Sequence, residues 1–196
     1  PSGSVDTNTI GTYIITYNAA DSSTNAAISV SRTVNVVDTT DPVLTLLGID
    51  PTDAEWTQPY VDAGATASDN YYGDITSSII VVNPVNTLVI GNYTITYDVT
   101  DASLNSATQL TRVVNVVDTV APIVSSLSAV PTVVTATITF NTNEGATAVI
   151  NYGETSTYDM VGTVTAVADT THDITLTGLN ACGQRYHYSL TVTDTH

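Results

Sequence analysis

Apolar and polar residues alternate along much of the chain with a period of two. The clearest stretch is residues 93–99, where Tyr, Ile, Tyr and Val are separated by Thr, Thr and Asp. Successive side chains of a β-strand point to opposite faces, so this pattern predicts a half-buried strand with Tyr93, Ile95, Tyr97 and Val99 directed inward. Residues 110–117 continue the pattern, with Arg112, Val114 and Val116 on one face. No segment has a helical period, and the sequence predicts an all-β fold.

A second feature is internal repetition. Residues 91–122 repeat residues 11–42 without a gap, and about half of the positions are identical. Repetition on this scale indicates tandem modules of one kind. We therefore divide the chain into the C-terminal part of one repeat (residues 1–40), a complete repeat (residues 41–119) and a different module (residues 120–196). For residues 42–118 we expect an antiparallel sandwich of seven or eight strands, with one strand spanning 75–82.

The partial repeat has no sequence counterpart for the first half of the complete one. We expect about three strands in residues 5–40, with an uncovered apolar face formed by Tyr13, Ile15, Tyr17, Val34 and Val36. Such open sheets recruit further strands. The missing cover would come from continuous sequence outside this segment, or from strands donated by a neighbouring copy, as in filaments.

Residues 120–196 alternate in four further stretches, ending with Tyr186, Tyr188, Leu190 and Val192 on one face. The pattern predicts another sandwich that lacks its closing strand.

Several short motifs follow one another in the complete repeat: PVLTLLG, YVDAGATASDN, GDIT, GNYTITYDVTD and RVVNVVD. In this order they resemble a bacterial immunoglobulin-like repeat of surface proteins, a type also found in a pesticidal crystal protein. Residues 120–196 resemble a fibronectin type III-like module. The resemblance implies tandem immunoglobulin-like and fibronectin type III-like β-sandwiches, with the hydroxyl of Tyr186 tying a loop to the sandwich near Leu179. Leu104 stands where the bacterial repeat usually has a glycine.

The charge distribution excludes two classes of partner. The net charge is −16, and the chain has no lysine and only three arginines. Nucleic acids and anionic membranes are bound through clustered cations, so we expect neither partner. No apolar run approaches the roughly 18 residues of a spanning helix, which predicts no membrane insertion in this segment. Polarity carried by Thr, Ser and Asn suits an extracellular or cell-surface protein.

Catalytic signatures are missing from the sequence. It has no nucleophile elbow, no phosphate-binding glycine loop and no zinc-binding histidine pair. The three histidines, His172, His187 and His196, have no metal-ligand spacing, and we expect all three to be solvated at the surface. The sequence thus predicts a protein that is not an enzyme and has no certain cofactor.

Loop carboxylates and amides form the main candidate site. Two groups fall between predicted strands, and Ca²⁺ prefers oxygen ligands of this kind. The second group is echoed by Asp21 and Asn25 in the partial repeat. In the alternative, Asp and Asn cap turns through their own side chains. The candidate ligands are Asp69, Asn70 and Asp74 in the first group and Asp98, Asp101 and Asn105 in the second.

Three smaller predictions concern other loop and edge residues. Tyr71 and Tyr72 are adjacent aromatic residues on a loop and are candidate contacts for a glycan or a protein. Cys182 is the single cysteine, and we expect its disulfide partner outside this chain segment. Asn92 begins a three-residue glycosylation signal, a motif that often arises by chance.

The sequence therefore favours a structural or adhesive spacer of a larger secreted or cell-surface prokaryotic protein. Its partners would be other modules of the same protein, neighbouring copies, or a glycan or surface protein. Two alternatives remain open. One is an accessory carbohydrate-binding or spacer region of an extracellular hydrolase, and the other is a subunit of an extracellular filament.

Overall fold

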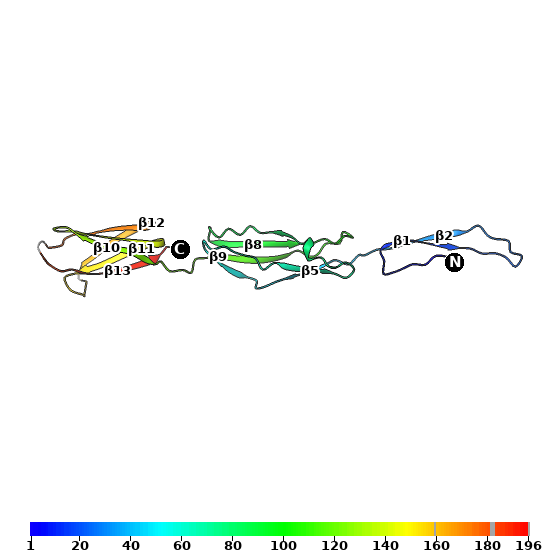
Figure 1. The fold of residues 1–196 in the computed structure, drawn as a ribbon, viewed down its shortest axis with the longest axis horizontal. Helices are drawn as coiled ribbons and strands as arrows, with labels where there is room; N and C mark the ends of the chain where they lie inside the picture. The colour runs from blue at the N-terminus through cyan, green and yellow to red at the C-terminus, as the bar shows by residue number, and fades with distance from the viewer. Residues whose placement is uncertain (159, 181–182, 196) are drawn as a thin grey trace. The chain divides into compact units, whose positions relative to one another are not determined.

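The computed structural model describes residues 1–158, 160–180 and 183–195. The chain forms two compact units, Pro1–Val117 and Asp118–His196. Strands dominate both, so the predicted all-β fold is confirmed (Figure 1). Among the described residues, no helix is long and apolar enough to cross a membrane.

The partial repeat is a two-stranded antiparallel hairpin, β1 (Gly11–Tyr17) and β2 (Val30–Val36) (Figure 1). Tyr13 lies opposite Val34, so the predicted apolar residues share a face. No residue of 1–40 is buried, and this face is uncovered as expected. The prediction of a third strand within residues 5–40 is wrong: Ser2 alone adds an isolated antiparallel bridge to Thr16, and a turn closed by a hydrogen bond from Asn8 N to Asp6 Oδ1 (2.9 Å) precedes Gly11.

The complete repeat is a sandwich of two sheets. The first sheet has three strands in the order β3 (Val43–Leu46), β5 (Ala65–Asp69) and β6 (Gly73–Asp74). The second has four strands in the order β4 (Thr52–Glu55), β9 (Leu110–Val117), β8 (Gly91–Asp98) and β7 (Ile80–Val82). Short strands with alternating inward residues let the two sheets bury one face each.

The predicted register of β8 and β9 is confirmed. Ile95 and Tyr97 are 0% exposed and Val99 is 3% exposed, while Tyr93 packs at the margin of the same core. On β9 the predicted inward residues Arg112, Val114 and Val116 are all buried. Each large apolar side chain removed from water contributes roughly 1.5–3 kcal/mol. The core of this repeat therefore depends mainly on these two strands and on Leu44, Ala65 and Ala67 of the facing sheet.

Two details of the prediction are wrong. The sandwich is not wholly antiparallel, because β4 pairs with β9 in parallel. After Leu46 the chain turns at Gly48 (φ 77°) and crosses to the other sheet instead of forming a hairpin, and a crossover permits the parallel direction.

The predicted strand over 75–82 is also interrupted, by a 3₁₀ turn, η1 (Thr76–Ser78). There the amide of Thr76 donates to Asp74 Oδ1 (2.9 Å), and its hydroxyl accepts from Ala67 N (3.0 Å). Local side-chain hydrogen bonds of this kind compete with strand pairing. After this turn Ile80–Val82 form the short strand β7.

The second unit contains β10 (Val124–Pro131), β11 (Ala136–Gly153), β12 (Met160–Leu176) and β13 (His187–Asp194). The long β11 pairs with β10 and β12 in its first half and with β12 and β13 in its second. Register shifts after Asn141 separate the halves and let the sheet fold over its own core. That core consists of Ile138, Phe140, Ala148, Ile150, Tyr152, Ile174 and Leu176, which lie at alternating positions of β11 and β12.

The prediction that all three histidines are solvated is wrong for His172. It is 2% exposed, and its ring stacks on Phe140 with 4.6 Å between centroids. Its Nε2 lies 3.0 Å from Thr142 Oγ1. His172 shares a phase with Ile174 and Leu176, so strand alternation directs it into the core. His187 is exposed as expected, and His196 lies outside the described residues.

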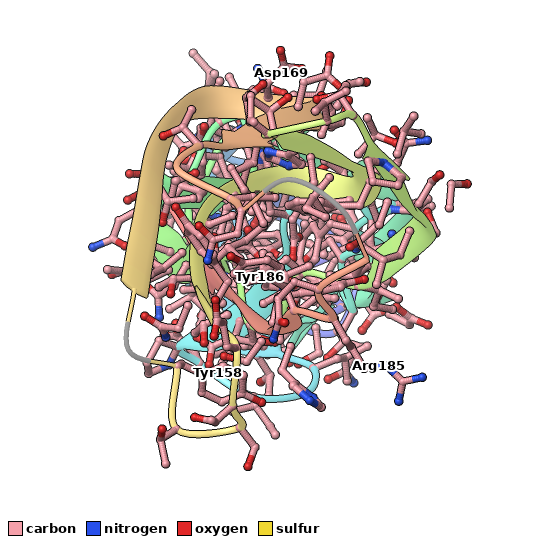
Figure 2. The ribbon with its side chains drawn as sticks, turned by 90° about the vertical axis from the view of Figure 1, so that its left-hand side faces the viewer. Tyr158, Asp169, Arg185 and Tyr186 are labelled. Atoms are coloured by element: carbon pink, nitrogen blue, oxygen red, sulfur yellow. The ribbon has the colours of Figure 1, made fainter. Side chains whose placement is uncertain are left out.

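Tyr186 makes the hydrogen bond expected of it. Its hydroxyl accepts from the amide of Asn180 (2.9 Å), and Leu179 packs against the core beside it. The neighbouring side chain Arg185 projects away from the ribbon, so the two diverge (Figure 2). The phenol group of Tyr186 is therefore one of several ties between the sandwich and the described part of this loop, together with hydrogen bonds from Asn180 Nδ2 to Glu154 (2.8 Å) and from Leu179 N to the carbonyl of Val134 (3.2 Å).

Candidate cation site at the junction of the two repeats

Asp38 is the second residue of the connector between β2 and β3, residues 37–42. Its Oδ1 accepts from Thr40 N (3.0 Å), which closes a tight turn. Asp118 closes an equivalent turn after β9, where its Oδ1 accepts a hydrogen bond from Val120 N (3.2 Å). The turn leaves Asp38 Oδ2 buried, and among the described residues that oxygen has no hydrogen-bond partner.

Asp69 ends β5 and is 8% exposed. Its Oδ1 accepts from two successive amides, Tyr71 N (2.8 Å) and Tyr72 N (2.9 Å). Its Oδ2 is buried and finds no hydrogen-bond partner within the described part of the chain. A buried carboxylate oxygen without a hydrogen bond is unfavourable unless a cation or a hydrogen-bond donor lies against it.

Asp101 lies in the turn between β8 and β9 and is 5% exposed. Its Oδ1 accepts from Asn105 N (2.8 Å) and its Oδ2 from Asn105 Nδ2 (2.8 Å). Burial raises the pKa of Asp101, but the hydrogen bonds from Asn105 outweigh it, and the pKa falls below its usual value. Asp101 is therefore held as a carboxylate.

These three carboxylates meet at one point. One oxygen each from Asp38, Asp69 and Asp101 lie within 4.8 Å of one another. Asn105 Nδ2, which donates to Asp101, also reaches the carbonyl of Asp38 (3.3 Å). Because Asp38 belongs to the connector and the other two to loops of the complete repeat, the cluster spans the junction between the repeats.

The structure thus brings together only part of the predicted ligand set. Asp69, Asp101 and Asn105 come from both predicted groups and lie in one place. Asp74 caps the turn at Thr76, as in the turn-capping alternative. Asp98 accepts two hydrogen bonds from Gln109 Nε2 (2.9 and 2.8 Å), and Asn70 is exposed.

Sequence reasoning missed Asp38, because it is remote in sequence from both predicted groups. One signal could have found it. In a tandem array the connector that leaves one repeat passes the loops at the near end of the next repeat. An acidic residue of the connector should therefore be grouped with the acidic residues of those loops.

Tyr71 and Tyr72 also lie at the junction. Their rings meet edge to face, with 5.0 Å between centroids. The hydroxyl of Tyr71 accepts from the amide of Ile10 in the partial repeat (3.2 Å), and that of Tyr72 lies 2.8 Å from Ser103 Oγ. Both phenol groups thus make contacts within the chain, and Tyr71 crosses from one repeat to the other. A role in binding a glycan or another protein stays a prediction.

Two remaining predicted residues add little to this site. Asn92 is exposed on β8, and its glycosylation stays a prediction. Cys182 lies outside the described residues.

A separate groove of about 600 Å³ opens in the second unit. Apolar side chains such as Ile138 and Leu179 line it together with aromatic and polar ones, among them Tyr152, Asn180, Gln184, Tyr186 and Tyr188. The sequence did not predict this groove, because Tyr186 and Tyr188 alternate in phase with core residues.

Comparison with solved structures finds distant similarities. The lipoprotein BT2262 from Bacteroides thetaiotaomicron matches with a TM-score of 0.36 at 20% identity, over 68% of this chain and 54% of that chain. A Clostridium perfringens ZmpB structure with CBM51-2 in complex with GlcNAc and INT domains matches with a TM-score of 0.34 at 13% identity, over 78% of this chain and 44% of that one. Structural similarity at this level does not transfer function. The chain spans about half or less of the length of these structures.

A search of the curated proteins finds no match to the chain. The comparison with family models gives a clear result. The model described as "Bacterial surface protein, Ig-like domain" matches residues 1–36 and 44–116, more than half of the chain. These two ranges follow the partial and the complete repeat found by internal comparison. The chain therefore belongs to the family of bacterial surface protein Ig-like domains.

Proposed function

We propose that this chain is a structural spacer segment of a larger secreted or cell-surface bacterial protein and is not itself catalytic. Membership of a surface-protein family supports the location. The observation that carries the spacer role is the set of contacts across the repeat junction: Tyr71 to Ile10, and Asn105 to Asp38. A short connector with direct contacts on both sides limits bending between modules. Such modules extend other parts of a protein away from the cell.

The experiment is a deletion that shortens the parent protein, displayed on its own cells. Removing residues 42–121, one repeat period, should leave surface display intact and bring the distal part closer to the cell. Antibody labelling of intact cells measures display, and immunogold distance measures reach. Unchanged reach would contradict the spacer role. Loss of surface display would point to a role in export or anchoring.

A second candidate function is carbohydrate binding as an accessory region of an extracellular hydrolase. The groove of the second unit favours it, because glycan sites combine aromatic faces with nearby polar groups. A glycan array probed with the whole chain and with the Tyr188→Ala variant tests this function. Specific binding lost in the variant supports it, and absence of binding rejects it. Adhesion through another surface remains a prediction. Assembly into filaments also remains a prediction, and electron microscopy of the purified chain is its direct test.

A further inference from the structure

We infer that Asp38, Asp69 and Asp101 bind a calcium ion that joins the partial repeat to the complete repeat. The inference deepens the proposed spacer role, but the ion site is tested by binding alone. A chain that binds no calcium at this point could still be a spacer.

The first argument is geometric. Ca²⁺ bonds to oxygen at 2.3–2.6 Å, so two oxygens on the same ion are separated by at most about 5 Å. The three carboxylate oxygens lie within 4.8 Å of one another and meet this limit. They come from the connector, the end of β5 and the β8–β9 turn, so the ligands surround a point from separate chain segments.

The second argument is the state of the oxygens. A cluster made only for turn capping would use its carboxylate oxygens on nearby amides. Asp38 and Asp69 use Oδ1 in this way, but each keeps a buried Oδ2 for which the described residues offer no hydrogen-bond partner. Asp69 is also more than nine-tenths buried. Desolvated oxygens of this kind are expected where a cation supplies the missing interaction.

The third argument concerns compensation of charge. The chain has no lysine, and Arg112 is the single cationic side chain in residues 41–119. Arg112 is committed to Asp62 inside the sandwich. Three carboxylates whose oxygens lie within 4.8 Å of one another repel one another, so an external cation of charge two is the natural partner. All donors are hard oxygens, which favours Ca²⁺ over softer metals.

The test uses the whole chain. Calcium sites of extracellular modules have dissociation constants of roughly 0.1–1 mM, so calorimetric titration to about 10 mM CaCl₂ should detect one site. Trp56 is the single tryptophan and packs against the core of the complete repeat, so its fluorescence reports unfolding of that repeat alone. We expect calcium to raise this midpoint by about 5 °C relative to chelator.

Two variants and one matched control make the test specific. Asp38→Asn and Asp69→Asn should each weaken calcium binding at least tenfold, and Asp69→Asn in chelator should unfold no earlier than wild type, because one repelling charge is gone. Asp21 makes the same turn with Asn25 in the partial repeat, so Asp21→Asn is the control and should leave calcium binding unchanged. No calcium binding by wild type would overturn the inference. Equal loss in Asp21→Asn and Asp69→Asn would also overturn it.

Discussion

Arg112 Nη1 lies 2.6 Å from Asp62 Oδ1 inside the complete repeat, with Arg112 1% exposed. Asp62 also accepts from the hydroxyl of Tyr97 (2.6 Å) and from the amide of Gly64 (2.9 Å). The guanidinium reaches the backbone carbonyls of Leu47 and Gly64 as well. This network joins β9, β8 and the segment before β5, so it connects the two sheets through a buried charge pair.

Breaking this pair should be costly. Asp62→Asn leaves a buried guanidinium without its counter-charge, and we expect the free energy of unfolding to fall by about 3–5 kcal/mol. Urea unfolding followed by Trp56 fluorescence measures the change for this repeat. A loss of less than about 0.5 kcal/mol, the range of an ordinary surface substitution, would contradict the assignment.

The same network sets a pH dependence. Burial raises the pKa of Asp62, but the hydrogen bond from Tyr97 and the charge of Arg112 outweigh it, and the pKa is lowered. A lowered folded-state pKa means that the stabilisation is complete above the ordinary value of about 3.9 and is lost as the pH falls below it. We expect the unfolding midpoint measured by Trp56 fluorescence to fall as the pH drops below about 4. In Asp62→Asn this midpoint should depend less steeply on pH. Equal slopes in the two proteins would refute this origin of the acid sensitivity.

At high pH the dependence of stability on pH has the opposite sign, because stability falls as the pH rises. Burial and the hydrogen bond to Asp62 raise the pKa of Tyr97 well above its ordinary value of about 10. The protonated phenol is favoured in the folded state, so its stabilisation is complete below about pH 10 and is lost as the pH rises further. Tyr97→Phe should flatten the loss of stability between about pH 10 and 12, measured by the same fluorescence. A wild-type slope in Tyr97→Phe would show that other groups dominate there.

Leu104 occupies the left-handed region with φ 71° and is 83% exposed. A side chain in this conformation costs about 1–3 kcal/mol, and here it returns no packing. Leu104→Gly should therefore raise the free energy of unfolding by about 1 kcal/mol, after the extra backbone entropy of glycine is subtracted. Leu104→Ala keeps the Cβ atom and should gain nothing, which makes it the control. If both variants are equally stable, the turn is not strained.

Much of this fold follows from the sequence because its signals are local. The alternation in residues 93–99 predicts which side of β8 is buried, and the internal repetition separates the two repeats. Even the unusual Leu104 is visible, since the family resemblance places a glycine there and the structure places a positive φ. The strand alternation and the turn at Leu104 depend on residues close together in the chain, and the repetition is visible by direct comparison of two stretches of sequence.

Two of the features that were missed depend on distant residues. The parallel pairing of β4 with β9 is a choice between sheets, and nothing within residues 52–55 expresses it. Asp38 joins Asp69 and Asp101 only when two repeats meet, so grouping acidic residues by proximity in sequence separates true partners and includes Asp74 and Asp98. The miss at His172 is local: the lack of a metal-ligand spacing says nothing about burial, whereas its phase with Ile174 points inward.

Tyr186 allows a stability test in the second unit. Tyr186→Phe removes the hydroxyl that accepts from Asn180 N, and we expect a loss of about 1 kcal/mol in the free energy of unfolding. Hydrogen exchange of peptides from β13 measures stability in this unit. Tyr188→Phe is the control, because its hydroxyl has no hydrogen-bond partner among the described residues. A larger effect of Tyr188→Phe would show that the loop is not held through Tyr186.

The central claim is that the two repeats form a stiff structural segment held at their junction. Spin labels on β2 and β8, attached through Thr33→Cys and Thr94→Cys in a Cys182→Ser chain, measure the distance distribution between the repeats by pulsed electron resonance. Both threonines are exposed, so labelling should not disturb the cores. In calcium we predict a single narrow distribution that broadens in chelator and in Asp69→Asn. A broad distribution that calcium leaves unchanged would contradict the claim.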